Sequence, residues 1–350
     1  MHVRLTQIDG KLPNLALMKL AHWHRACGDD VYFTKKVERG MFEPNYDIVY
    51  GSAIFSHSGG RVESLLREFP DAIVGGTWRL DVITTVEQHL GLETYEQYDY
   101  SIYPHFDASL GFTQRGCRLK CGFCVVPKKE GKPRSVNTIA DIYRGVWFNP
   151  TLRRDEPAPR HLHLLDNDFF GQPEEHWRAR LDEIRDGKFK VCFNQGINVR
   201  MITDESAAAL KSIAYYDDSF RVRRLYTAWD NLKDEGVFMR GVNRLRDAGI
   251  PPSHLLVYML VGWDQKETWE RIFYRFNRMT ALGIKPFPMI YGSRTRRLPL
   301  GGYNGRVGQR TLGDFQRWAV RKLYTVLPFE AYDPSASELL DTQQLQPQLI

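Results

Sequence analysis

Short strand-like runs alternate with helical repeats along most of the chain, and this alternation limits the fold more than any other feature. It predicts parallel sheets covered by helices, that is, an α/β fold. In the first part of the chain, strands are expected at 3–6, 30–34, 46–51 and 71–76, and helices at 14–26 and 61–69. The polar and aromatic stretch 93–105 is expected to be a linker. We therefore predict a domain with a Rossmann-like parallel sheet over residues 1–105.

A second series of strand and helix patterns follows this domain. Strands are expected at 108–113, 161–165, 190–193, 224–228, 255–261 and 286–291, and helices at 138–148, 174–185, 204–213, 236–248 and 266–282. These make about six βα units, fewer than the eight of a closed barrel. We therefore predict an open, partial (β/α)6 barrel over residues 106–291, followed by an extension over residues 292–350.

The extension is strongly basic near its start. Residues 291–326 hold eight arginines and lysines against the single acid Asp314, a net charge of +7 where the whole chain has +6. Arginine and aromatic residues together suit phosphate contacts and base stacking, so an RNA or DNA partner is expected. Phe315 and Trp318 have an alternative role as core residues of a helix over 311–325. The residues expected to contact nucleic acid are Lys128, Lys129, Arg294, Arg296 and Arg297.

The composition excludes a membrane protein and a disulfide framework. There is no run of 18 apolar residues and no basic, then apolar, N-terminal segment, so a cytoplasmic protein with no membrane partner is expected. Five cysteines are present, and three of them fall within eight residues. A tight group of this kind in a long chain indicates metal ligation rather than disulfides.

The three grouped cysteines, Cys117, Cys121 and Cys124, have the spacing C-x3-C-x2-C. Three thiolates can bind three irons of a [4Fe-4S] cluster and leave the fourth iron open for another ligand. A structural zinc site usually needs four closed ligands, and the remaining cysteines, Cys27 and Cys192, stand alone. The spacing therefore favours an iron–sulfur cluster.

This loop, with Phe123 before its last cysteine, resembles the signature of the radical S-adenosylmethionine (SAM) superfamily. The resemblance implies the partial (β/α)6 barrel described above and catalytic roles for Cys117, Cys121 and Cys124. It also implies that the open iron binds SAM, which is cleaved reductively to a 5′-deoxyadenosyl radical. A reductant such as flavodoxin or ferredoxin is then an expected partner.

Three further segments resemble places where members of this superfamily contact SAM, each at the end of an expected strand. The first follows residues 161–165, the second follows 190–193, and the third resembles the glycine motif of the fifth strand. Together with Phe123, the expected SAM-binding residues are Asp166, Asn167, Asp168, Asn194, Gln195, Arg200, Val261 and Gly262.

The N-terminal domain resembles the cobalamin-binding-like domain that precedes the barrel in one branch of the superfamily. The strand ending in Gly75 and Gly76 matches the diglycine strand of that domain. The D-x-H-x-x-G motif that supplies a histidine ligand to cobalamin is broken, because Phe55 stands in the aspartate position two residues before His57. The resemblance therefore leaves cobalamin open as a cofactor, and the broken motif argues against it.

The sequence thus predicts a radical SAM enzyme that modifies a nucleic acid or nucleotide by methylation or methylthiolation. Methylthiolation is the weaker expectation, because Cys27 is the only cysteine of the N-terminal domain and no second cysteine triad exists. The alternative is a non-catalytic nucleic-acid-binding module with a structural zinc or iron–sulfur site. A small-molecule or peptide substrate stays open.

Overall fold

This computed structural model describes residues 1–79, 81, 85–303 and 306–334. By its internal contacts the chain divides into two compact units, one of residues up to Asp166 and one from Asn167 onward. The domain boundaries expected after residues 105 and 291 stay predictions. Residues 335–350 of the expected extension lie outside the described residues.

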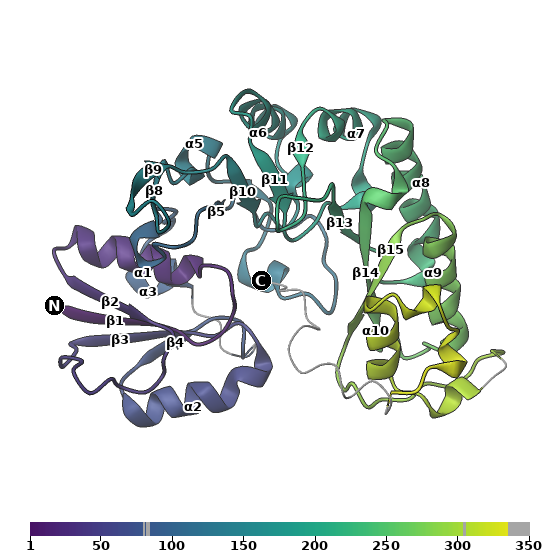
Figure 1. The fold of residues 1–350 in the computed structure, drawn as a ribbon, viewed down its shortest axis with the longest axis horizontal. Coiled ribbons are helices and arrows are strands. Elements are labelled where there is room, and N and C mark those ends of the chain that lie inside the picture. The colour runs from purple at the N-terminus through teal and green to yellow at the C-terminus, as the bar shows by residue number, and fades with distance from the viewer. Residues whose placement is uncertain (80, 82–84, 304–305, 335–350) are drawn as a thin grey trace. The chain divides into compact units, whose positions relative to one another are not determined.

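The first unit contains a parallel sheet with the strand order β2-β1-β3-β4. Helices α1 and α2 lie on opposite sides of this sheet (Figure 1). One buried cluster combines α1 with Val3 and Leu5 of β1, and the other combines α2 with Val49 of β3. The bounds are β1 His2–Gln7, α1 Leu15–Ala26, β2 Asp30–Thr34, β3 Ile48–Ser52, α2 Gly59–Glu68 and β4 Ile73–Gly75.

The structure of the first unit explains why the second residue of the diglycine, Gly76 after β4, must be glycine. Gly76 has a φ of +106°, and a Cβ on this residue would lie 1.8 Å from the carbonyl oxygen of Ala53. A side chain is therefore excluded at Gly76 by both the backbone conformation and the close approach of a second chain segment.

The segment expected to be a linker is instead packed into the core of the first unit. Ile102 and Tyr103 are buried in the same cluster as α1. The Tyr103 hydroxyl donates to Gln7 Oε1 over 2.9 Å and accepts from the backbone N–H of Asn14 over 3.0 Å. The composition of residues 93–105 is polar and aromatic, which suggested a linker. In the structure, tyrosines of this segment are packed into the core because their rings are buried and their hydroxyls form hydrogen bonds.

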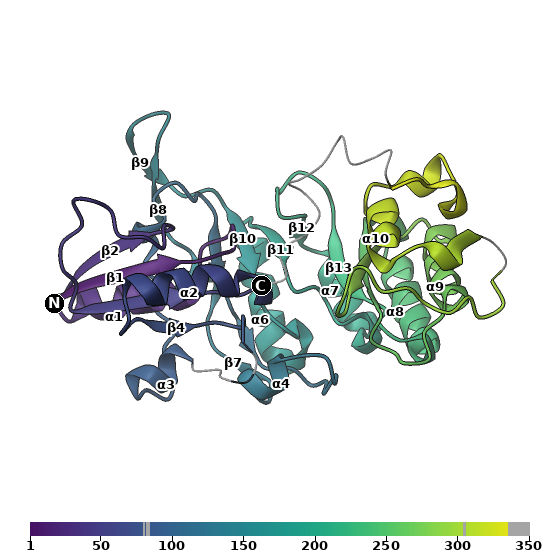
Figure 2. The ribbon, with the colours of Figure 1, turned by 90° about the horizontal axis from the view of Figure 1, so that it is seen from below.

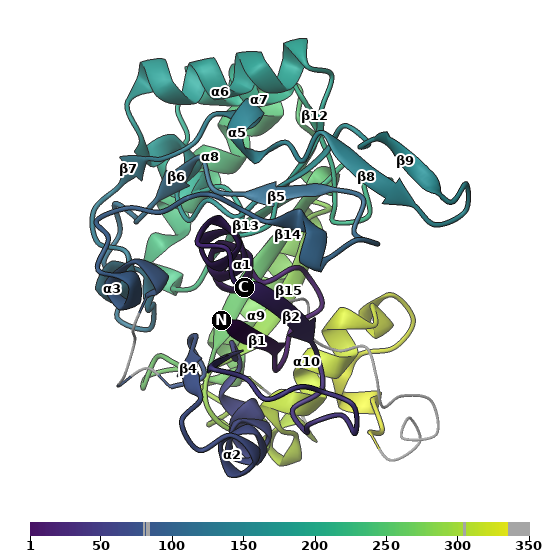
Figure 3. The same ribbon diagram turned by 90° about the vertical axis from the view of Figure 1, so that its left-hand side faces the viewer.

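The rest of the first unit contains one parallel strand pair, β5–β10, and two antiparallel pairs, β6–β7 and β8–β9. The β8–β9 hairpin extends away from the remainder of its unit (Figures 2 and 3). The bounds are α3 Val86–Leu90, β5 Ser109–Gly111, β6 Gln114–Arg115, α4 Val126–Lys129, β7 Arg134–Ser135, α5 Ile139–Ile142, β8 Val146–Asn149, β9 Arg154–Pro157 and β10 His161–Leu164.

The helix expected over 138–148 is wrong in its second half. It ends at Ile142, and Gly145 has a φ of +70°, a left-handed conformation that breaks a helix. The following residues, Val146, Trp147 and Phe148, are β-branched or aromatic and form β8 instead.

The second unit contains the parallel pair β11–β12 and the parallel sheet β13-β14-β15. Helices α6, α7, α8 and α9 follow one another along the outer side of these strands (Figure 1). The bounds are α6 Glu174–Asp186, β11 Lys190–Phe193, α7 Asp204–Lys211, β12 Ala214–Tyr215, β13 Leu225–Ala228, α8 Glu235–Asp247, β14 Leu255–Val261, α9 Trp269–Ala281, β15 Lys285–Ile290 and α10 Leu312–Val320.

The core role of Phe315 and Trp318 is the alternative that the structure supports. Phe315 is fully buried and Trp318 is 5% exposed, and both pack on Phe276 of α9. Their helix, α10, ends at Val320 rather than at the expected residue 325. These two rings are therefore not available for stacking on bases.

The class expected from the sequence is confirmed at this level: the protein is an α/β protein with parallel sheets. Within the residues that the structure describes, no helix has the length and apolar character needed to cross a membrane.

Candidate functional site

The cysteine loop of the first unit is closed at its base. Gly116 has a φ of +79°, and a Cβ there would lie 2.2 Å from the carbonyl oxygen of Lys132. The N–H of Gly116 donates to Glu130 Oε2 over 3.1 Å, and Arg115 Nε lies 3.3 Å from the same oxygen. Next to these contacts in sequence, the antiparallel pair β6–β7 joins the two ends of the loop. The loop that carries the cysteines is therefore held at both ends.

The three cysteines of this loop are all half-buried. The N–H of Leu119 donates to Cys117 Sγ over 3.4 Å, and the N–H of Cys124 donates to the carbonyl of Cys121 over 3.0 Å. No group of three or more His, Cys, Asp or Glu side chains gathered as around one metal ion occurs among the described residues. A cubane cluster binds each sulfur at a different iron, so its ligands need not meet at one point. The donor set, three thiols on one closed loop, fits a [4Fe-4S] cluster in kind and number.

The two lysines after the cysteines differ in exposure. Lys128 is exposed, whereas Lys129 is half-buried. Burial lowers the pKa of Lys129, and the nearby cations Arg115 and Lys19 lower it further. Lys128 is therefore the better placed of the two for an anionic partner.

Asp166, which was expected to contact SAM, forms hydrogen bonds with residues of the first unit. Its carboxylate accepts from the N–H of Thr113 over 2.7 Å, from the Thr113 hydroxyl, and from the N–H of Gln114 over 3.2 Å. Complete burial raises the pKa of Asp166 to about 7, against the lowering effect of these hydrogen bonds. Asp166 therefore joins the segment after β5 to the end of β10.

The raised pKa of Asp166 predicts a pH-dependent stability. The native state holds this proton up to about pH 7, whereas the unfolded chain releases it near the usual value of 3.8. The contribution of Asp166 to the free energy of unfolding is therefore largest below about pH 4, falls as the pH rises towards 7, and is constant above that. The expected loss is on the order of 4 kcal/mol, at ~1.4 kcal/mol for each pKa unit.

The Asp166→Asn variant is expected to lack this part of the pH dependence, because an amide keeps an acceptor for the two N–H groups and does not ionise. Urea unfolding from pH 4.5 to 8 measures the effect, with the exposed Asp155→Asn as the control. An Asp166→Asn curve parallel to that of the wild type over this range would show that Asp166 is ionised throughout.

The second unit has a pocket of about 720 Å³ at the carboxyl ends of β14 and β15. Such ends are where parallel sheets usually bind ligands, and the volume lies in the usual range of small-molecule sites. The pocket combines Gly262, expected to contact SAM, with Arg296, expected to contact nucleic acid, while Val261 is buried beside it. The lining residues are Asn231, Gly262, Trp263, Asp264, Gln265, Lys266, Tyr291, Gly292, Ser293 and Arg296.

Both polar backbone groups of Gly262 are used within the chain. Its N–H donates to Glu267 Oε2 over 2.8 Å, and its carbonyl accepts from Arg296 Nη1 over 2.6 Å. A ligand in the pocket would therefore meet Gly262 through its Cα rather than through its N–H. Arg296 is fixed at the pocket by the same contact.

A buried ion pair holds the backbone of Gly262 at this pocket, and neither of its residues is among the site residues expected from the sequence. Arg275 Nη2 donates to Glu267 Oε1 over 2.5 Å and to the carbonyl of Leu260 over 3.0 Å. Its Nη1 donates to the carbonyl oxygens of Trp229 and Asp230, each over 3.0 Å. Burial raises the pKa of Glu267, and the charge of Arg275 opposes this shift. In the sequence, a role of Glu267 at this site is indicated only by its position five residues after Gly262.

Two aromatic side chains stand at the pocket. Trp263 and Tyr291 are 38% and 45% exposed, and their ring centroids lie 4.6 Å apart in an edge-to-face arrangement. Exposed aromatic rings beside the cations Lys266 and Arg296 offer a stacking surface and positive charge to a nucleotide.

The other expected residues of the second unit are more dispersed. Arg200 Nη1 pairs with Asp234 Oδ2 over 3.0 Å, Arg294 Nη1 donates to Gln316 Oε1 over 2.5 Å, and Arg297 is exposed. Of the remaining expected residues, Asn167, Asn194 and Gln195 are half-buried, and Asp168 is buried. Phe123, on the cysteine loop of the first unit, is half-buried as well.

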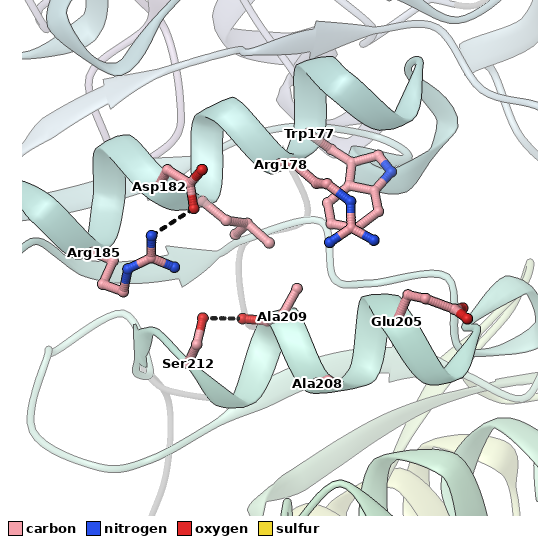
Figure 4. A pocket seen from close by; sticks show the side chains of 9 residues that line it. Trp177, Arg178, Asp182, Arg185, Glu205, Ala208, Ala209 and Ser212 are labelled. Carbon is pink, nitrogen blue, oxygen red and sulfur yellow. Dashed lines mark hydrogen bonds and ion pairs between the residues drawn. The ribbon is translucent and has the colours of Figure 1, made fainter.

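A second hollow, of about 300 Å³, lies between α6 and α7 on the outer side of the second unit (Figure 4). Two of its polar groups are hydrogen-bonded within their own helices: Arg185 Nη2 donates to Asp182 Oδ1 over 2.7 Å, and the Ser212 hydroxyl donates to the carbonyl of Ala209 over 2.7 Å. None of the expected site residues lines this hollow, so the larger pocket is the candidate site.

Fold and site together define an α/β protein of parallel sheets with a pocket at the carboxyl ends of β14 and β15. Comparison with protein-family models, with curated proteins and with solved structures found no match. The activity is therefore argued from the residues of this chain.

Proposed function

We propose that this protein is a radical SAM enzyme that modifies a nucleic acid or nucleotide. The observation that carries the proposal is the closed loop with the three thiols of Cys117, Cys121 and Cys124. The open, partial barrel and the three-part domain layout belong to the same proposal. The successive strand–helix units with parallel strands support them.

The residues of the loop have separable tasks. The thiolates of Cys117, Cys121 and Cys124 would hold the [4Fe-4S] cluster, and the N–H of Leu119 would hydrogen-bond one ligand sulfur. Gly116 and Glu130 keep the base of the loop closed. A [4Fe-4S] cluster held there would supply the reductive cleavage of SAM, with its electron taken from a flavodoxin- or ferredoxin-type donor.

The pocket of the second unit would seat a nucleoside group. Trp263 and Tyr291 offer rings for stacking, and Glu267 and Arg275 fix the backbone around Gly262. Arg296 and Lys266 place two positive charges at the same pocket, which suits phosphate groups. These features support a nucleotide or nucleic-acid substrate over an apolar one.

Cobalamin is not part of the proposed function. His57, the histidine of the broken motif, is exposed and stacks on Phe55 with ring centroids 5.2 Å apart. A histidine ligand to cobalamin would have an aspartate partner two residues earlier. Here that position holds Phe55, whose ring stacks on His57.

The test is formation of 5′-deoxyadenosine. The protein is reconstituted anaerobically with iron and sulfide, reduced with dithionite, and incubated with SAM, with and without total RNA or single-stranded DNA. The proposal expects 5′-deoxyadenosine and methionine in equal amounts, with more product when nucleic acid is present. A colourless protein with one tightly bound zinc and no product would support the non-catalytic binding module instead.

A further inference from the structure

Three cations of the second unit gather at the amino ends of its strands, at the opposite end of the sheet from Gly262. Arg224 directly precedes β13, Lys285 begins β15, and Lys322 follows α10. In the register of the sheet, Leu225 pairs with Leu255 and Leu256 pairs with Lys285, so β13, β14 and β15 start side by side (Figure 1). At about 3.3 Å for each residue of β14, the cluster lies about 20 Å from the candidate pocket.

The cations of this cluster act on one another. The positive charges of Arg224 and Lys322 both act on Lys285, and helix α10, which Lys322 follows, packs on β15. Two ammonium groups have only donors, so they cannot satisfy each other. Burial lowers the pKa of Lys285 first, and the charges of Arg224 and Lys322 lower it further.

No carboxylate compensates this charge within ion-pair distance in the described part of the chain. Asp217 is the acid whose charge reaches both Arg224 and Lys285, but its Oδ1 is taken by Ser219 and by two backbone N–H groups of its own loop. Several other arginines of this unit do have acidic partners. Among these pairs are Arg200–Asp234, Arg244–Asp204, Arg271–Asp264, Arg275–Glu267 and Arg278–Glu235.

The three side chains make few polar contacts within the described part of the chain. Arg224 is 7% exposed and uses its guanidinium for one hydrogen bond within the described chain, to the carbonyl of Ser253 over 3.1 Å. Lys322 is exposed and has a φ of 57°, the left-handed conformation common in the residue that follows a helix C-cap. An anion between the two ammonium groups would remove the repulsion and supply the missing acceptors.

We infer that Arg224, Lys285 and Lys322 form a phosphate-binding site at the amino ends of β13 and β15. The chemistry it recognises, a phosphate oxygen, occurs in free phosphate and in a nucleic-acid backbone. The choice of a polynucleotide as the source rests on the proposed function, and the phosphate site itself does not.

The neighbouring surface favours a nucleic-acid strand as the source. Arg223 lies over the rings of Tyr215 and Tyr216 at 5.0 and 4.8 Å, and Lys190 lies over Tyr216 at 5.2 Å. Lys190 begins β11, so another strand of this unit also starts with a cation. A row of cations with interleaved aromatic rings follows a polynucleotide backbone better than it encloses one small anion.

Binding of a fluorescent 20-nucleotide single-stranded RNA or DNA across a salt series tests this site. The Lys285→Gln/Lys322→Gln variant is compared with Lys35→Gln/Lys36→Gln, which removes the same charge from exposed positions of the first unit. We expect the cluster variant to lose about 2 from the slope of log K against log salt, since each lost phosphate contact removes ~0.9, and the control to keep the wild-type slope. Equal slopes for the two variants would overturn the assignment of this site to a polynucleotide, and a phosphate site is tested separately by thermal stability.

A second readout separates this site from the proposed chemistry and from misfolding. The melting temperature is measured in phosphate and in chloride at equal ionic strength, without SAM or a cluster. The wild type is expected to melt higher in phosphate, and the cluster variant is expected to be at least as stable as the wild type in chloride and insensitive to phosphate. If phosphate protects the wild type but the oligonucleotide slopes are equal, the polynucleotide assignment is overturned. Oligonucleotide binding that depends on the cluster, without 5′-deoxyadenosine formation, would refute the enzyme proposal alone.

Discussion

Replacing any one of Cys117, Cys121 or Cys124 with alanine is expected to reduce 5′-deoxyadenosine formation to the level of a protein-free control. Each of the three thiolates would bind a different iron of the cluster. The two thiolates that remain in a variant would therefore not hold a [4Fe-4S] cluster with a single iron left open for SAM. The loop itself should persist, because its closure depends on Gly116, Glu130 and the β6–β7 pair rather than on sulfur. Product is measured by chromatography after anaerobic reconstitution, with iron content determined on the same samples.

Cys27→Ala is the matched control for these variants. Cys27 is exposed, lies in the same unit, and follows α1 at a distance in sequence from the loop. We expect it to keep the iron content and activity of the wild type. Full activity in any one of the three loop variants would contradict the assignment of that cysteine as a cluster ligand.

Arg275→Met is expected to destabilise the second unit by about 3–5 kcal/mol, the usual cost of breaking a buried ion pair by removing one partner. The side chains of Arg275 and Glu267 are 1% and 5% exposed. Methionine would leave the Glu267 carboxylate and three backbone carbonyls without their donor. Chemical unfolding followed by tryptophan fluorescence measures the change, because Trp229 and Trp269 are fully buried in the same unit.

Two comparisons identify the cause of the Arg275→Met effect. Arg278→Met removes an arginine that is 51% exposed and pairs with Glu235, and it should cost less than about 1 kcal/mol. Adding Glu267→Gln to Arg275→Met removes the unpaired charge and should recover part of the loss. If Arg275→Met costs no more than Arg278→Met, the ion pair does not support the pocket.

The sequence predicted regular strands well where the local pattern was unambiguous. The expected strands 30–34, 190–193 and 255–261 coincide with β2, β11 and β14. The helix over 138–148 failed because a left-handed glycine and the strand pairing of β8 with β9 overrode a helical spacing. The short pair β6–β7 was missed because two-residue strands leave no periodic signal.

The candidate site was predictable only in part. The cysteine loop could be found from spacing, because all three thiols belong to one short segment. The pocket could not, because it depends on contacts between segments far apart, such as Arg296 on Gly262 and Arg275 on Glu267. The cluster of Arg224, Lys285 and Lys322 likewise follows from strand register, which a single sequence does not reveal.

The proposed activity depends on three cysteine sulfurs that hold a [4Fe-4S] cluster with one iron open to SAM. Electron paramagnetic resonance of the reconstituted, dithionite-reduced protein, before and after addition of SAM, is the measurement that tests this arrangement. We expect the signal of a reduced [4Fe-4S] cluster whose g values shift when SAM is added, and no such signal in a Cys117→Ala variant. A cluster signal that SAM leaves unchanged, or no cluster signal in the wild type, would contradict it.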